Sequence, residues 1–301
     1  MQCDTVSKQM NYLIPESAVT GKGANQVVSY LHDFLLNHAL GEKHGFFHGD
    51  NCCAQNKNNI LMGYFLWRVL NNFHESITMS FLPVGHTKFS PDPAFGIFKS
   101  KFRRSDVNNL DELINVVVDS TPDSKLNNAK LVGDVSGNVF VPVYNWQQLH
   151  HDLNFKNIPN IKSFHKFIFS CEFKGRVRLY ESAYSPEFTE FVMCADHKIV
   201  SDDLPPTVSP IGLSAQRQLY LYNSIRPFVA DHSKDILCPK PTEPGFTGPS
   251  VCPLNRQLKT AKTKTVFDET FVRASPKCGF CGQTGHRNSV LRGKFTCPER
   301  H

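Results

Sequence analysis

The apolar positions along the first hundred residues change repeatedly between a strand-like and a helix-like spacing. Short apolar runs that end in proline or polar residues are typical of strands, and apolar residues three and four positions apart predict one buried helix face. The segment at 57–74 is apolar over most of its helical surface, so we expect it to be deeply buried. The predicted elements are strand 9–15, helix 25–39 with Asn25 as its cap, strand 45–50, helix 57–74, strand 77–82 and a helix from about 93 to 102.

The pattern beyond residue 105 predicts one helix, then several strands, then a last helix before a change of composition. The predicted elements are helix 109–120, strands 138–144, 164–169, 176–180 and 188–194, and helix 214–228. Prolines and glycines then cluster between 239 and 253, which predicts a linker with little core. We therefore divide the chain into an α/β core over 1–125, a strand-rich extension of the same domain over 126–232, a linker over 233–265 and a tail over 266–301.

Charge is unevenly distributed along the chain. The formal net charge is +6, but residues 255–301 hold ten Lys and Arg against three acids, so the remaining residues carry a net charge of −1. A basic tail favours polyanions, because each neutralised phosphate releases a counterion. The alternative is a tail that only improves solubility.

The length of the chain and its cysteine content limit the classes of protein to which it can belong. At 301 residues, the chain is long enough for one large domain and an appendage. It has no apolar run of about 18 residues, so we expect no membrane partner. The opening residues lack the basic flank and apolar stretch of a signal peptide, which predicts an intracellular protein. Its ten cysteines are then expected to be thiols or metal ligands rather than disulfides.

Two aspartates stand at the ends of predicted elements. Asp50 ends the strand at 45–50, and Asp92 opens the helix about 40 residues later. The order of elements, with acids at their ends, matches the second half of a ribonuclease-H-like fold, a mixed sheet flanked by helices. Carboxylates from separate elements can hold two Mg²⁺ or Mn²⁺ ions about 4 Å apart for phosphodiester cleavage or strand transfer. The alternative is that each aspartate only caps the next helix or turn.

Two long motifs resemble those of a transposon-associated family, the domain of unknown function 7869 family. They are GDNCCAQNKNN at 49–59 and VGHTKFSPDPAFG at 84–96, which correspond to the family patterns D-N-C-x-x-Q-N-K-N and G-H-T-K-F-x-x-D-x-x-F-G. The resemblance covers about residues 5–230, with shorter matches at 21–25, 101–104, 141–146, 161–167 and 212–218.

The resemblance implies a ribonuclease-H-like transposase or integrase relative, with Asp50 as the second catalytic acid and Asp92 as the third. A complete site of this kind also needs a first aspartate on an opening strand. Asp4 is the only acid in the first ten residues and lies in no convincing strand. We therefore expect either a truncated chain or a domesticated remnant, and an incomplete catalytic triad in both cases.

The side chains around Asp50 and Asp92 offer supporting roles. Four amide side chains are expected to orient Asp50 or cap the following helix rather than to contact phosphate or bases; they are Asn51, Gln55, Asn56 and Asn58. His48 and His86, beside the two acids, are candidates for proton relays, although a lone histidine is more often a satisfied polar residue. Cys52 and Cys53 are expected to be buried structural thiols, because no base is paired with them in the sequence; a cysteine hydrolase is the competing hypothesis.

The tail contains a pattern similar to a retroviral-type zinc knuckle. Cys278, Cys281 and His286 have knuckle spacing, and Cys297 supplies a fourth ligand after ten residues instead of four, with His301 as the alternative. Four such ligands within about 24 residues favour tetrahedral Zn²⁺. The surrounding basic residues are predicted to contact phosphates; they are Lys277, Arg287, Arg292 and Lys294.

Together these features predict a transposase-derived, nucleic-acid-processing protein with a metal site for phosphodiester chemistry and a zinc-binding tail. The competing hypothesis is a non-catalytic nucleic-acid-binding remnant. A nuclear location follows from the inferred function alone. The choice between DNA and RNA, and a homo-oligomeric state, stay open at the level of the sequence.

Overall fold

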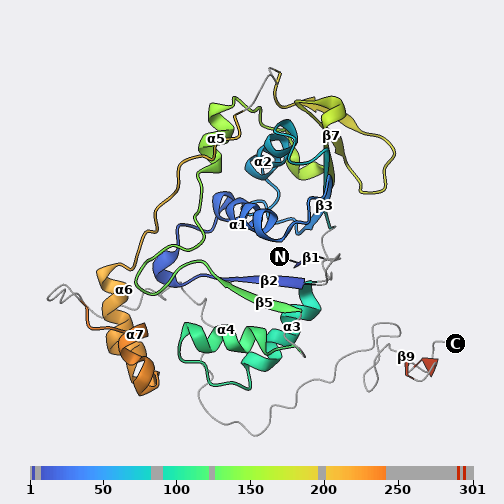
Figure 1. The fold of residues 1–301 in the computed structure, drawn as a ribbon. Coiled ribbons are helices and arrows are strands. Elements are labelled where there is room, and N and C mark those ends of the chain that lie inside the picture. The colour runs from blue at the N-terminus through green and yellow to red at the C-terminus, as the bar shows by residue number, and fades with distance from the viewer. Residues whose placement is uncertain are drawn as a thin grey trace, which may run out of the picture. The chain divides into compact units, whose positions relative to one another are not determined.

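The computed structural model describes residues 2–3, 8–82, 91–121, 126–195, 201–241, 290–291 and 294–295 (Figure 1). Two compact units divide the chain, Met1–Phe246 and Thr247–His301. The second unit contributes one antiparallel pair, β9 (Val290–Leu291) and β10 (Lys294–Phe295). The first residues of the predicted linker thus belong to the first unit, where they form part of its last helices.

A five-stranded mixed sheet carries the main core of the first unit. Its strands are ordered β3 (His44–Gly49), β4 (Ser76–Phe81), β6 (Lys166–Ser170), β7 (Arg176–Tyr180) and β8 (Thr189–Val192). β3 and β4 are parallel, and every later neighbour is antiparallel. A parallel pair needs a crossover connection, and α2 supplies it between β3 and β4. The predicted mixed sheet with flanking helices is confirmed.

Helix α2 (Asn59–Leu70) is the centre of the core. Every residue from Leu61 to Leu70 is buried, as the all-round apolar pattern predicted. The helix begins at Asn58, whose side chain accepts hydrogen bonds from the backbone N–H groups of Ile60 and Leu61. α2 packs on β4 and β6 and on helices α1 (Ala24–His38) and α5 (Trp146–Asp152). It thereby joins the sheet to the helical layer.

Helix α1 buries polar side chains that the apolar pattern did not anticipate. Ser29 and His32 are buried beside Val28. The Ser29 hydroxyl oxygen accepts hydrogen bonds from Tyr144 N and Trp146 Nε1, each at 2.9 Å, which attaches the 144–146 segment to the helix. The predicted cap is wrong: α1 begins after Gly23, which makes no side-chain cap.

A second, three-stranded sheet lies on the side of α1 that faces away from α2 (Figure 1). It has the order β1 (Gln2–Cys3), β2 (Lys8–Leu13) and β5 (Asn127–Leu131), with β2 and β5 parallel. Asp33 of α1 accepts a hydrogen bond from Tyr12 of β2 at 2.7 Å and pairs with Lys130 of β5 at 2.9 Å. Helix α4 (Leu110–Val118) packs on β5, and α3 (Pro91–Phe102) packs on α4.

Several predicted boundaries in the second half were wrong. Residues 138–144 form no strand; they make only isolated bridges, from Val139 to Gly133 and from Tyr144 to Thr207. β5 and α5 were not predicted. The helix predicted at 214–228 divides into α6 (Ala215–Tyr220), a π-helical turn η5 (Leu221–Ile225) and a 3-10 turn η6 (Arg226–Phe228).

The remaining elements are short. They are 3-10 turns η1 (Glu16–Ala18), η3 (Ile161–Ser163), η4 (Cys171–Phe173) and η7 (Asp231–Ser233), and helix α7 (Lys234–Leu237). Ser233 and Cys238 are buried, so η7 and α7 are packed against the unit rather than extended away from it. None of the described helices combines the length and the apolar character needed to cross a bilayer.

Candidate functional site

Asp50 lies where the parallel strands β3 and β4 end together. The register pairs Gly49 with Phe81, and Leu82 N donates to Gly49 O at 3.2 Å. Because the strands are parallel, the residues that follow both of them reach the same edge of the sheet. Asp50 is therefore presented at this edge, as the sequence predicted, and its side chain is exposed.

A tight turn after β3 holds one oxygen of Asp50. Asp50 Oδ1 accepts hydrogen bonds from Cys52 N at 3.0 Å and from Asn56 Nδ2 at 2.6 Å. The turn is closed by the Cys52 carbonyl, which accepts from the backbone N–H groups of Gln55, Asn56 and Lys57. Among the described residues, Oδ2 of Asp50 has no hydrogen-bond partner. The carboxylate is thus oriented through one oxygen and presents the other to solvent.

The buried side chain of Lys57 stabilises the same turn through hydrogen bonds. Its side chain is only 3% exposed, and its Nζ donates to Asn51 Oδ1 at 3.1 Å and to the Lys162 carbonyl at 2.9 Å. Asn51 Nδ2 in turn donates to the Leu82 carbonyl. The side-chain amide of Asn51 and the ammonium of Lys57 therefore connect the ends of β3 and β4 to the turn η3.

Burial lowers the pKa of Lys57 below its ordinary value, with a smaller opposing contribution from nearby Cys53. The ammonium also lies 5.3 Å from the centroid of the Phe81 ring, where a cation is attracted to the ring face. No carboxylate forms an ion pair with Lys57 within the described ranges. Lys57 belongs to the D-N-C-x-x-Q-N-K-N motif, but its sequence context gives no sign of this buried position.

The other predicted neighbours of Asp50 have different positions. Asn56 contacts the carboxylate directly, and Asn51 acts on the turn through Lys57 and Leu82. Gln55 is exposed at the surface of the turn. His48 is an exposed residue of β3, one residue before its end.

Asp92 lies in the first turn of α3 and is exposed. It follows segment 83–90, which contains His86 and lies outside the described residues, so the structure does not test the pairing of His86 with this site. In the part of the chain that the structure describes, no group of three or more His, Cys, Asp and Glu side chains is positioned to hold a metal ion.

Neither of the cysteines adjacent to Asp50 is buried, so the prediction of buried thiols is wrong. Cys52 is exposed and Cys53 is half-buried, because both lie in the surface turn rather than on a strand or helix. The Cys53 thiol lies 3.6 Å from the Asn51 carbonyl oxygen. No histidine forms a hydrogen bond with either thiol within the described ranges.

The predicted zinc ligands lie outside the described residues; they are Cys278, Cys281, His286, Cys297 and the alternative His301. The same holds for Lys277, Arg287 and Arg292, and for the side chain of Lys294, whose backbone forms part of β10.

The fold and this edge of the sheet define a mixed α/β protein that presents an oriented, exposed carboxylate after a parallel strand pair. The chain belongs to the family described as Domain of unknown function (DUF7869), whose family model matches residues 9–186. The match includes Asp50, the turn that holds it, and Asp92. No curated protein and no solved structure gave a significant match.

Proposed function

We propose that the chain is a transposase-derived, ribonuclease-H-like protein that processes nucleic acid, with Asp50 as a metal-binding carboxylate at the end of β3. The observation that carries this proposal is the asymmetric environment of Asp50. One oxygen is held by Cys52 N and Asn56, and the other faces solvent without a partner in the described part of the chain.

This environment fits a divalent cation of the Mg²⁺ type as one ligand of a larger set. Hard cations take carboxylate oxygens, and a ligating carboxylate is usually oriented by further hydrogen bonds. Asp92 is the second proposed ligand, supported by its exposed position in the first turn of α3. When bound, two such ions supply activation of the attacking oxygen and stabilisation of the leaving oxygen.

The chain's own residues would prepare the site for that chemistry. Asn56 and the backbone of Cys52 fix the direction of the Asp50 carboxylate, so less of its freedom has to be lost when a cation binds. Lys57 and Asn51 hold the turn itself. The charge of Lys57 also lies on the inner side of the turn, where it favours anionic groups at this edge of the sheet.

We also propose that the tail binds zinc and nucleic acid. Cys278, Cys281, His286 and Cys297 would bind Zn²⁺, and Lys277, Arg287, Arg292 and Lys294 would contact phosphates of DNA or RNA. The support is the ligand spacing and the basic charge of the tail.

The test is cleavage of labelled DNA by the purified chain in Mg²⁺ or Mn²⁺, with Asp50→Asn and Asp92→Asn. Asparagine keeps the oxygen that accepts from Cys52 N and Asn56, so Asp50→Asn should fold normally while losing the negative charge. Asp152→Asn is the matched control, because Asp152 is an exposed aspartate of α5. Binding of Mn²⁺, followed by electron paramagnetic resonance, gives a second measurement that does not depend on turnover.

We expect both site variants to lose cleavage and to weaken Mn²⁺ binding, and Asp152→Asn to retain both. Cleavage that survives Asp50→Asn would refute the proposed role of this carboxylate. A chain that binds DNA but neither cleaves it nor binds Mn²⁺ would instead establish the competing function, a non-catalytic nucleic-acid-binding remnant.

A further inference from the structure

Helix α3 presents a row of aromatic rings beside a cluster of cations. Phe95, Phe98 and Phe102 follow one another along the helix, with ring centroids 5.6 and 6.1 Å apart. Phe95 is 51% exposed and Phe102 is 43% exposed. Soluble proteins usually bury such rings, so an exposed row beside charged groups indicates a binding surface.

The end of α3 and the residues after it carry an excess of positive charge. Four exposed cations lie within six positions, and the nearby acid is Asp106; the cations are Lys99, Lys101, Arg103 and Arg104. None of the four forms an ion pair with another residue of the described ranges. Unpaired surface cations of this density attract an anionic partner rather than stabilise the fold.

The aromatic row ends at a groove of about 550 Å³. Phe102, Asp106 and Asn108 are among the residues of one wall, and Phe228 and Ala230 are among those of the other. Phe228, in the 3-10 turn η6, is 87% exposed although it is a large apolar side chain. Two rings from distant parts of the chain therefore border one open groove, and the four cations lie in the chain segment that leads up to it.

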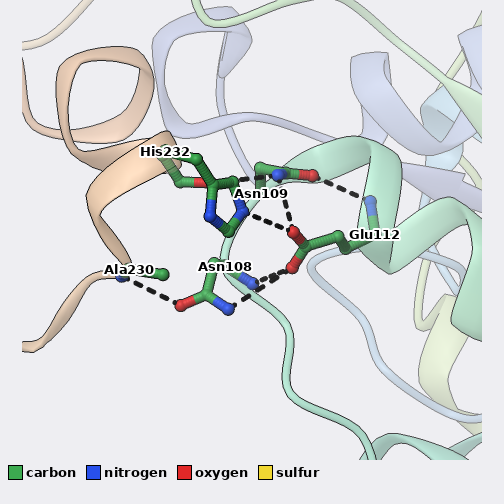
Figure 2. A network of polar contacts seen from close by, with 6 residues as sticks. Asn108, Asn109, Glu112, Ala230 and His232 are labelled. Atoms are coloured by element: carbon green, nitrogen blue, oxygen red, sulfur yellow. Dashed lines mark hydrogen bonds and ion pairs between the residues drawn. The ribbon is translucent and has the colours of Figure 1, made fainter.

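A polar network holds the two walls together (Figure 2). Asn108 Oδ1 accepts a hydrogen bond from Ala230 N at 3.2 Å, and the Asn108 backbone N–H donates to Glu112 at 2.6 Å. Glu112 also contacts His232 Nε2 at 2.9 Å and accepts a hydrogen bond from Asn109 at 2.9 Å. The groove is thus formed before any ligand binds.

We propose that this surface, the α3 aromatic row with its four cations and the groove between Phe102 and Phe228, binds single-stranded DNA. The backbone phosphates would contact Lys99, Lys101, Arg103 and Arg104, and unpaired bases would stack on the two phenylalanine rings. A positively charged path with aromatic stacking platforms is the arrangement by which proteins hold single strands without sequence preference.

The chemistry of the groove favours a single strand over a duplex, because the faces of paired bases are covered by their neighbours and cannot reach a phenylalanine ring. The choice of DNA rests on the proposed function, in which a DNA strand is the substrate. The surface is separate from the Asp50 carboxylate in its residues and needs no metal ion, so binding and cleavage can be measured independently.

The experiment measures binding of a labelled oligothymidylate of about 20 nucleotides to the full chain in EDTA, by fluorescence anisotropy at low and moderate salt. The test variant is Phe102→Ala/Phe228→Ala. Its matched control is Tyr184→Ala, which removes an aromatic ring that is 95% exposed elsewhere on the unit. A second variant, Arg103→Gln/Arg104→Gln, is compared with Lys22→Gln/Lys43→Gln at exposed positions remote in sequence. Circular dichroism confirms that each variant is folded.

Stacking on one aromatic side chain contributes enough that its loss weakens binding by roughly 5- to 100-fold. We therefore expect at least a fivefold loss for the phenylalanine variant on the single strand and no loss on a duplex. The arginine variant should lose affinity and show a weaker salt dependence, and both control variants should bind like the unmodified chain.

Because the basic tail also attracts DNA, the position of the strand is mapped by photocrosslinking with an oligonucleotide that contains 5-iododeoxyuridine. Crosslinks in the peptides that contain Phe102 or Phe228 support the proposal. Crosslinks confined to the tail, unchanged affinity of the phenylalanine variant, or tighter binding of an RNA strand would each overturn it. Asp50→Asn should bind the strand normally, so a failure of cleavage alone leaves this inference standing.

Discussion

Acidification is expected to begin destabilising the core near pH 6.5, above the range in which carboxylates titrate. Two buried histidines cause this effect. His32 and His74 are each 4% exposed, and in both cases burial, reinforced by the positive charge of Arg68, lowers the pKa from 6.5 to about 4. Arg68 donates hydrogen bonds to Tyr64 Oη at 3.0 Å and His74 Nδ1 at 3.3 Å, so its charge lies within the same cluster.

The direction in which pH changes the free energy of unfolding follows from proton binding. Between pH 6.5 and about 4, the unfolded chain protonates these imidazoles more readily than the folded chain does, so the free energy of unfolding falls as the pH falls. For each histidine, the two pKa values correspond to a loss of about 1.3 kcal/mol at about pH 5.5 relative to about pH 7.5. Protonation of the pair should therefore lower the free energy of unfolding by about 2.6 kcal/mol, which is a large part of the stability of a typical domain.

Urea unfolding at these two pH values, followed by tryptophan fluorescence, measures the difference. The variant His32→Asn/His74→Asn should lose most of the pH dependence. A smaller slope should persist, because burial also lowers the pKa of His150. His151→Asn is the matched control, since that side chain is 84% exposed. An unfolding free energy that is equal at the two pH values, or a double variant that keeps the full slope, would show that the buried imidazoles do not control stability.

Three further substitutions test other parts of the fold. Lys57→Met leaves the acceptors on Asn51 and Lys162 unpaired, so we expect a loss of about 2 to 4 kcal/mol in urea unfolding; an unchanged stability would contradict the role given to this ammonium. Gly63→Ala should lower the melting temperature despite the higher helix propensity of alanine, because the added Cβ would lie 2.7 Å from the His150 ring; a stabilised variant would refute this packing. The hydrogen bonds from Asn108 and His232 lower the pKa of Glu112, so the contribution of this carboxylate is present above its unfolded pKa and is lost on acidification below it. Glu112→Gln should accordingly increase amide hydrogen exchange in residues 226–238 at neutral pH, and exchange equal to that of the unmodified chain would exclude the network as the attachment of this segment.

The part of the candidate site that is local in sequence could be predicted. Asp50 follows an apolar run and precedes a helical pattern, so its place at a strand end was readable from spacing alone. The capping function expected of the amides near Asp50 belongs to Asn58, and Asn56 orients the carboxylate. Both contacts span only a few residues, within the reach of turn and cap rules.

The burial of Lys57 could not be predicted, because lysine in a polar run is normally solvated. Its burial depends on the turn η3, whose Lys162 carbonyl lies 105 positions away in sequence and accepts from the ammonium. The groove beside α3 has the same origin, since Phe102 and Phe228 come from distant segments.

Taken by itself, the sequence determined the alternation of strands and helices up to α3, the burial of α2 and the mixed α/β class, because periodicity records which face of an element is removed from water. The tertiary structure alone decided which elements pair. The polar segment Asn127–Leu131 has no strand pattern, yet it becomes β5 because its backbone groups pair with β2, more than 110 positions earlier. Likewise, the Ser29 hydroxyl is buried because Tyr144 N and Trp146 Nε1 donate to it, and buried His32 is hydrogen-bonded through Nδ1 to Tyr64. Such pairings depend on hydrogen-bonding partners that are distant in sequence, and local periodicity carries no information about them.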